Sequence, residues 1–168
     1  MGEAVSPQRE IKGELFRLTS KTTGITEKTD SEVENYALRY TFAPIWEYQV
    51  PVGQEFVIKP EHRFSAYIED DEVSPAEWRD DQKVRVEVWD TSKLRMQIVY
   101  QGMYMESKEL QDTELMARLD LLDVPLLLKS GDWIVIAGYS WRSLYTIDVS
   151  DSYFNLEVER IRPGLFRE

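Results

Sequence analysis

Cysteine is absent from this 168-residue sequence, and histidine occurs once, as His62. Without cysteine the chain has no disulfides, no thiolate metal sites and no cysteine nucleophile. His62 lies among charged residues in the segment 59–63, where a lone histidine is typically a surface residue rather than a general base or a metal ligand. A single histidine also excludes the double-stranded β-helix type of metal site, which uses a pair of them.

Long apolar segments are absent too. No run approaches the roughly 20 residues that span a bilayer, and the N-terminal sequence MGEAVSPQRE has no apolar region typical of a secretory signal. We therefore expect a protein that is made in the cytoplasm and has no membrane span. Asparagine occurs only at Asn35 and Asn155, and with many glutamates, arginines and tryptophans this gives a thermophile-like composition, although an ordinary acidic domain explains it equally well.

Familiar catalytic motifs are missing as well. The eight glycines form neither a Walker A loop nor a dinucleotide-binding fingerprint. The stretch 138–142 begins like a G-x-S-x-G nucleophile elbow but ends in Arg142. The sequence therefore predicts no catalytic residue, no cofactor and no enzymatic activity.

Carboxylates are plentiful, and two groups of them have a spacing that could hold Ca²⁺. These groups are 70–72 with Asp80 and Asp81, and Asp148 with Asp151. Neither matches an EF-hand loop, so we interpret both as solvated acidic loops and expect no metal site. Carboxylates that act as a pair come together in space rather than in sequence, which leaves a small hydrolase with an acidic site as a third functional alternative.

The balance of charge is strongly acidic, with a formal net charge of -11. An acidic surface repels nucleic-acid phosphates and anionic membranes, so we expect neither as a partner. Docking onto a basic protein surface is the expected consequence. Hydrophobic residues make up 42% and charged residues 30% of the chain, which is typical of a globular protein.

The most regular pattern is the stretch 84–100, VRVEVWDTSKLRMQIVY. Val84, Val86 and Val88 alternate with polar or aromatic neighbours, which indicates a half-buried strand. The turn residues 90–93 follow, and then a second alternating run places Leu94, Met96, Ile98 and Tyr100 on one face. This pattern predicts a β-hairpin whose apolar face is buried against a second layer of structure.

Short alternating runs separated by turn residues continue along the chain. The runs that we expect to be strands are 10–18, 36–46, 47–50, 55–58, 63–69, 133–138, 144–149 and 153–161. They predict an all-β fold, an antiparallel β-sandwich or jelly roll with at most one short helix. Residues 1–9 are expected to form a flexible N-terminal arm and residues 10–168 a single β-sandwich domain.

Three segments do not fit the strand pattern. Residues 19–34 are polar and are expected to form a long loop. Ser74 and Pro75 predict one turn of helix in an acidic loop that contains Trp78. Residues 109–122 fit a short helix or an irregular turn leading into a strand, although Ala117, Leu119 and Leu121 also fit a strand throughout.

Tryptophan side chains are the best candidates for contacts with partners or ligands. Trp133 lies in an apolar run and is expected in the core, whereas Trp89 beside the hairpin turn and Trp141 beside Arg142 are expected to be more exposed. We therefore select Trp89, Trp141, Arg142 and Trp78 as candidate interface or ligand residues. If these side chains are exposed, the alternative function is that of a carbohydrate-binding β-sandwich module.

Three stretches together carry a resemblance to a known class of proteins. They are 48–57 with its Val-Pro-Val-Gly turn, 126–135 with Leu-Lys-Ser-Gly-Asp-Trp, and 147–154. In these stretches the sequence resembles the small β-sandwich or jelly-roll virion proteins of tailed phages and related viruses, the capsid decoration (cement) or minor capsid class. The resemblance implies a structural virion protein that forms homo-oligomers, expected here as trimers, and that docks on a viral major capsid protein. The arm 1–9 and the segment 19–34 would then act as clamps on neighbouring subunits.

Overall fold

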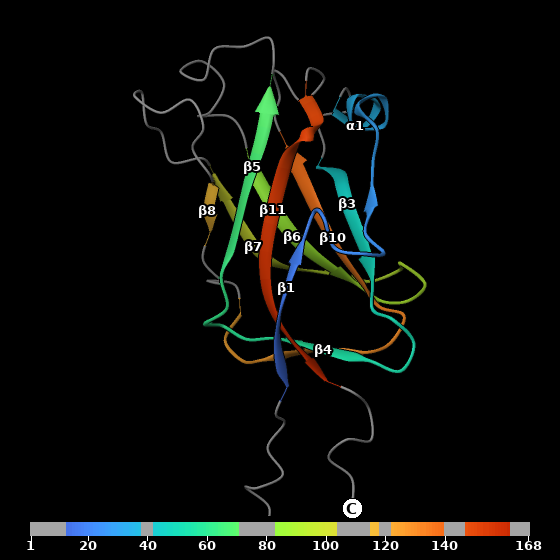
Figure 1. Ribbon diagram of the computed structural model, residues 1–168, viewed down its shortest axis with the longest axis vertical. Helices are drawn as coiled ribbons and strands as arrows, with labels where there is room; N and C mark the ends of the chain where they lie inside the picture. Colours follow the sequence, from blue (N-terminus) through green and yellow to red (C-terminus); the bar gives the residue numbers. More distant parts are fainter. Residues whose placement is uncertain are drawn as a thin grey trace, which may run out of the picture.

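A computed structural model of the chain describes residues 13–37, 42–70, 83–103, 115–117, 122–139 and 147–161. Within these ranges the chain forms two antiparallel β-sheets and one helix (Figure 1). The expected all-β sandwich with at most one short helix is thereby confirmed for the described residues. The sheet that contains β1, β5 and β11 lies in front of the sheet that contains β3, β6, β7 and β10 in this view.

The first sheet is built around one long strand, β11 (Ile147–Ile161), and we call it the β11 sheet. Along one edge, β11 pairs with β5 (Phe64–Asp70) and then with β4 (Glu55–Ile58), while β1 (Glu14–Thr19) pairs with its other edge. The strands β8 (Leu115–Ala117) and β9 (Leu126–Leu128) extend the sheet beyond β5 and β4. All of these pairings are antiparallel.

The second sheet is centred on β10 (Trp133–Tyr139), and we call it the β10 sheet. Its strand order is β2-β3-β10-β6-β7. The bounds of the remaining strands are β2 (Thr26–Glu27), β3 (Ala43–Gln49), β6 (Lys83–Trp89) and β7 (Met96–Met103). Because β3 and β4 belong to different sheets, the Pro51–Gly53 turn between them carries the chain from one layer to the other.

Aromatic side chains from both sheets meet in the core. The rings of Trp46 and Phe154 lie 5.1 Å apart, and those of Phe64 and Tyr100 lie 5.3 Å apart. Such tilted ring contacts add to the free energy gained by removing these large side chains from water. The Tyr100 hydroxyl donates a hydrogen bond to the backbone carbonyl of His62, so β7 of one sheet is tied to the β4–β5 turn of the other. Burial raises the pKa of Tyr100, and its hydroxyl therefore stays protonated.

His62 is buried, which shows that its interpretation as a surface residue was wrong. Its Nδ1 accepts a hydrogen bond of 3.0 Å from the Lys59 backbone N–H, and its Nε2 lies 3.7 Å from a Glu159 carboxylate oxygen. The Lys59 ammonium forms an ion pair of 2.6 Å with the same Glu159 carboxylate oxygen. The His62 side chain therefore stabilises the turn between β4 and β5 from its buried side, through a backbone bond to Lys59 and a contact with Glu159 on β11.

The central hairpin is confirmed, with its turn at the expected residues 90–93. The expected single apolar face of its second strand is wrong, however. The register shifts between Val86 and Glu87, so that Tyr100 pairs with Val86 on the inner face while Ile98 pairs with Glu87 on the outer face. The extra residue, Val99, is buried with Tyr100. A β-bulge of this kind reverses the side-chain alternation beyond it.

The segment 19–34 is not the long loop that its polarity predicted, because it contains β2 and the start of helix α1 (Asp30–Ala37). The helix begins with a capping box in which the Thr29 N–H donates to Glu32 and the Glu32 N–H donates to the Thr29 hydroxyl. The bond from the Thr29 backbone also lowers the pKa of Glu32. Val33 is fully buried in the core, and the helix, which continues to Ala37, replaces the beginning of the strand expected from Tyr36.

The two strands expected over 144–149 and 153–161 are one continuous strand in the described range, β11. Its pairing with β5 jumps from Asp148 to Tyr153, which leaves a bulge. Within that bulge the Asp148 carboxylate accepts hydrogen bonds from the Ser150 hydroxyl and the Asp151 N–H, and these bonds lower the pKa of Asp148. The Asp30 carboxylate at the start of α1 accepts a bond from the Val149 N–H, so the helix and the bulge support each other.

Three turns contact one another near the end of the sandwich opposite α1 (Figure 1). They are the β3–β4 turn around Gly53, the β9–β10 turn around Gly131, and the hairpin turn that contains Thr91. The Gly131 N–H donates to the Val50 carbonyl, and the Thr91 hydroxyl donates to the Asp132 carboxylate. Both glycines have positive φ angles, +81° for Gly53 and +93° for Gly131, which side chains disfavour.

These glycines provide a test of the turn packing. Gly53→Ala meets no atom within 4 Å, whereas a Cβ at Gly131 would lie 2.9 Å from the Thr91 Oγ1. We expect both substitutions to lower the free energy of unfolding by about 1 kcal/mol for the positive φ, and Gly131→Ala to cost about 1 kcal/mol more for the clash. Urea denaturation of the two variants measures this difference.

The Thr91→Ala background supplies the control, since it removes Oγ1 and Cγ2 and leaves a Cβ contact of 3.6 Å at Gly131. In that background the two glycine substitutions should cost the same. A difference that persists there would contradict the proposed contact between the turns.

Candidate interaction surface

The outer face of the β10 sheet brings together side chains from four strands in two adjacent rows. The pairing registers define these rows, because residues paired across an antiparallel ladder point to the same face. One row consists of Gln49, Trp133, Trp89 and Met96. The next row consists of Glu47, Val135, Glu87 and Ile98.

The structure places only part of the predicted site. Trp89 lies on this outer face and is half-buried, whereas Trp78, Trp141 and Arg142 fall outside the described residues. Trp133 was expected in the core but is half-buried beside Trp89 on the outer face. The prediction for Trp133 was wrong because both faces of β10 carry apolar side chains. Ile134 and Ile136 point into the core, so Trp133 and Val135 point outward.

Glu87 is a buried carboxylate on this outer face, with an exposed fraction of 4%. The Arg85 guanidinium Nε lies 2.5 Å from one of its oxygens, and the Trp89 indole N–H donates to the other at 2.9 Å. All three residues alternate along β6 and therefore share one face. The Arg85 guanidinium also stacks 3.9 Å from the ring centroid of Phe42, which fixes its position.

Lys93 reaches the same face from the hairpin turn. Its backbone has a φ of +58°, a left-handed conformation, while the Asp90 carboxylate accepts hydrogen bonds from the N–H groups of Leu94 and Arg95. These bonds, with that from Arg95 foremost, lower the pKa of Asp90. The Lys93 ammonium lies 4.1 Å above the ring centroid of Trp133 and 3.0 Å from the Glu47 carboxylate. The turn conformation thus directs a cation across the sheet.

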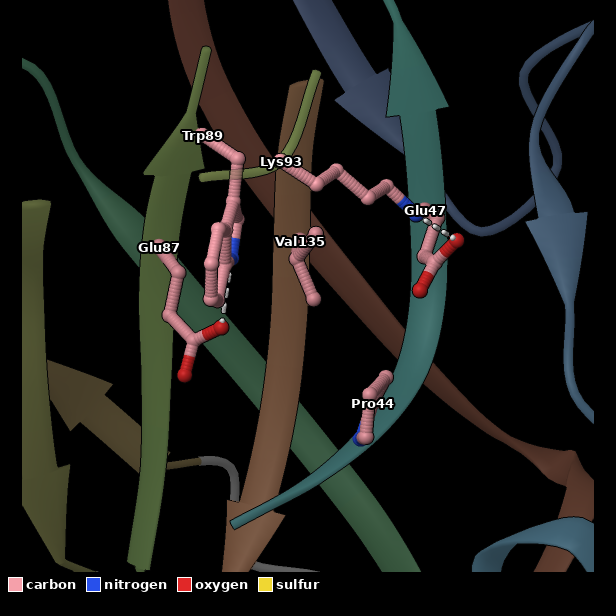
Figure 2. Close-up of a pocket in the computed structure, with 6 residues that line it drawn as sticks. All are labelled: Pro44, Glu47, Glu87, Trp89, Lys93 and Val135. Atoms are coloured by element: carbon pink, nitrogen blue, oxygen red, sulfur yellow. Dashed lines mark hydrogen bonds and ion pairs between the residues drawn. The ribbon is translucent and has the colours of Figure 1, made fainter. Parts of the chain in front are cut away.

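These side chains enclose a hollow of about 250 Å³. Val135 forms its floor, Trp89 and Glu87 stand on one side, Glu47 and Pro44 lie on the other, and the Lys93 side chain crosses above Val135 (Figure 2). Val135 is only 2% exposed although it faces outward, because the longer side chains overhang it. The hollow can accept a small polar group, since aromatic, aliphatic and charged surfaces all border it.

Sequence reasoning had selected only Trp89 from this hollow. The alternation along β6 was a usable signal for Glu87, which precedes Trp89 by two residues and therefore shares its face. The other four lining residues come together only through the register of neighbouring strands and the conformation of the hairpin turn. They are Pro44, Glu47, Lys93 and Val135. Within the described ranges, no group of three histidine, aspartate or glutamate side chains is arranged to hold a metal ion.

The outer face of the β11 sheet has a different character. A single row crosses four of its six strands, β9, β4, β11 and β1, and contains Leu127, Val57, Glu159 and Leu15. The two ends of the row are exposed leucines, Leu127 at 43% and Leu15 at 56%. Each leucine lies on a strand with one paired neighbour among the described residues, so apolar side chains mark two opposite edges of this sheet.

No protein-family model matches the chain, and no curated protein matches it. Among solved structures it is similar to VP17, a capsid protein of bacteriophage P23-77, with a TM-score of 0.38 and 7% identity over 89% of this chain and 97% of VP17. It is also similar to the VP16–VP17 complex of the two major capsid proteins of that phage, with a TM-score of 0.40 and 7% identity over 90% of this chain and 100% of that chain. Both matches are capsid proteins, the broad class that the sequence resembles. Within the described residues, no helix has the length and apolar composition of a membrane span.

The contacts of Glu87 with Arg85 and Trp89 yield a prediction about the free energy of unfolding. Arg85→Met leaves a buried carboxylate without its cation, and we expect it to lower the free energy of unfolding by about 2 kcal/mol. Arg85→Met/Glu87→Gln removes the unpaired charge as well and should recover part of that loss. Urea denaturation at neutral pH measures both variants.

Arg17→Met is the matched control, because the Arg17 side chain is 68% exposed and lies 4.0 Å from Glu157. It should change the free energy of unfolding by less than about 0.5 kcal/mol. If Arg85→Met is as mild as this control, the pairing of Arg85 with Glu87 is not a stabilising element of the sheet.

Proposed function

We propose that this chain is a non-enzymatic structural protein of a virus particle, a capsid decoration (cement) or minor virion protein that forms homo-oligomers and docks on a capsid lattice. The virion setting of the proposal comes from the resemblance of the stretches 48–57, 126–135 and 147–154 to phage virion proteins. The observation that carries the assembly role is the row across the β11 sheet that ends in an exposed leucine at each edge.

The two edges suit pairing with each other. β9 and β1 are both edge strands among the described residues, and the row from Leu127 to Leu15 covers three inter-strand spacings, about 14 Å. β9 is antiparallel to β4 and β4 is antiparallel to β11, so β9 runs with β11 and opposite to β1. The β9 edge of one copy and the β1 edge of a similarly oriented copy would therefore pair as antiparallel strands.

Such a contact joins two different surfaces, because the β9 edge of one copy meets the β1 edge of the next. Head-to-tail contacts of this kind close into rings when the rotation between copies allows it. A ring of three copies matches the trimer expected from the sequence. The net charge of -11 favours a basic partner surface on the capsid lattice, and screening by salt would then weaken the docking.

The mass of the purified protein in solution tests the assembly role. Light scattering at micromolar concentration should give a defined oligomer, with the mass of three 19.8 kDa chains expected. Leu15→Glu/Leu127→Glu places charge at both edges and should reduce the mass to that of a monomer, because burying an unpaired carboxylate opposes the contact.

Thr23→Glu/Gln97→Glu is the matched control, because it adds the same charge at two other exposed positions and should leave the oligomer intact. A wild-type protein that is monomeric at this concentration contradicts the proposal. An oligomer that survives charge at both leucines would contradict the edge-to-edge contact in particular.

A further inference from the structure

The hollow on the outer face of the β10 sheet has an apolar interior and a polar rim. Its floor is Val135, and Trp89 and Pro44 form apolar walls on opposite sides. Figure 2 shows the Trp89 ring nearly edge-on, with one of its faces turned toward Val135. The indole N–H is bonded to Glu87, and this bond holds the ring upright on the sheet.

The charges around the hollow are already paired with one another. Glu47 lies 3.0 Å from Lys93 and 3.9 Å from Lys28, and Glu87 lies 2.5 Å from Arg85. Two carboxylates and one cation, Lys93, line the hollow, and Lys28 and Arg85 pair with these carboxylates from outside its lining. Neither carboxylate is without a partner. A cationic ligand would compete with Lys93 and Arg85 for carboxylates that are already paired, and an anionic ligand would compete with Glu47 for Lys93.

A neutral ligand with hydroxyl groups disturbs none of these pairs. A carboxylate has about four lone-pair positions, and an ammonium group has three N–H donors, so Glu47 and Lys93 retain hydrogen-bonding capacity after their mutual contact. Their positions are fixed by the ion pair and by the stacking of Lys93 on Trp133. The rim thus offers acceptors and a donor in a pre-organised arrangement.

We infer that this hollow binds one neutral sugar ring, with an apolar face of the ring stacked on Trp89 and its hydroxyl groups bonded to Glu47 and Lys93. The ring of a neutral sugar combines C–H surfaces with hydroxyl groups around its edge, which matches an aromatic wall beside a polar rim. The volume of about 250 Å³ lies below the range of pockets that hold drug-sized ligands, so the site takes a single ring unit. This activity is additional to the proposed assembly role and does not depend on it.

NMR titration of the protein, labelled with nitrogen-15 and carbon-13, with defined small molecules tests this inference. The neutral probes are glucose, galactose, mannose, N-acetylglucosamine and N-acetylgalactosamine, and the charged probes are glucosamine, N-acetylneuraminic acid and Nα-acetyl-arginine amide. At least one neutral sugar should shift the Trp89 indole N–H and the Val135 methyl signals, with a dissociation constant on the order of millimolar. Glucosamine should bind more weakly than glucose, because its ammonium group would compete with Lys93 for the Glu47 carboxylate.

Variants locate the contact. Trp89→Leu removes the stacking surface but retains an apolar side chain, and Glu47→Gln retains the shape of the rim but removes its charge. Each should raise the dissociation constant of the bound sugar about tenfold. Tyr153→Ala is the matched control, because it removes a partly exposed aromatic ring from the outer face of the β11 sheet and should leave binding unchanged.

Two results would overturn the inference. The first is that no neutral sugar shifts the Trp89 and Val135 signals at concentrations up to tens of millimolar. The second is that only Nα-acetyl-arginine amide shifts them, which would make the hollow a socket for a basic side chain of a protein partner. The methyl signals of the core serve as an internal check that each variant is folded.

Discussion

The long strand β11 determines where every other strand of the β11 sheet lies, either by direct pairing or through β4 and β5. This strand pairs with β1 along one edge and with β5 and β4 along the other, so it connects segments from the beginning, middle and end of the described chain. Its inner side chains, among them Phe154, Leu156 and Val158, are fully buried and form one wall of the core. The exposed leucines on β1 and β9 share a row only because β11 and β4 hold their strands in register.

Most of the longer strands in the described ranges were predictable from the sequence, because side chains that alternate between apolar and polar indicate the two faces of a strand. The hairpin over 84–100 and its turn are the best example. The short strands β2 and β9 were not predicted. The places where this reasoning failed are local irregularities: a bulge at Val99 exchanged the faces of β7, and a four-residue bulge joined two expected strands into β11. A bulge changes backbone pairing without leaving a distinct pattern in the side chains, so alternation alone does not locate it.

Helix α1 is a different case, since its capping box, Thr29 with Glu32, was present in the sequence. The helix was missed because Val33 is the only apolar residue in its first five positions, and its last two residues, Tyr36 and Ala37, fitted the start of an expected strand. The hollow on the β10 sheet was predictable only in part. Trp89 and Glu87 share a strand face, whereas Glu47 and Lys93 meet through cross-strand register and a left-handed turn residue that no local pattern specifies.

The three interlocked turns distinguish two kinds of position for inserting a foreign peptide. The Gly131 backbone N–H donates to the Val50 carbonyl, and the Gly131 Cα lies against the Thr91 side chain. A segment inserted at Gly131 would therefore break the contacts of this turn with the other two turns. The neighbouring Val52–Gly53 tip is almost fully exposed at Val52, and the space around Gly53 is open. This tip is therefore the natural site for displaying an epitope or an affinity tag, because chain added there leaves the hydrogen bonds that join the turns in place.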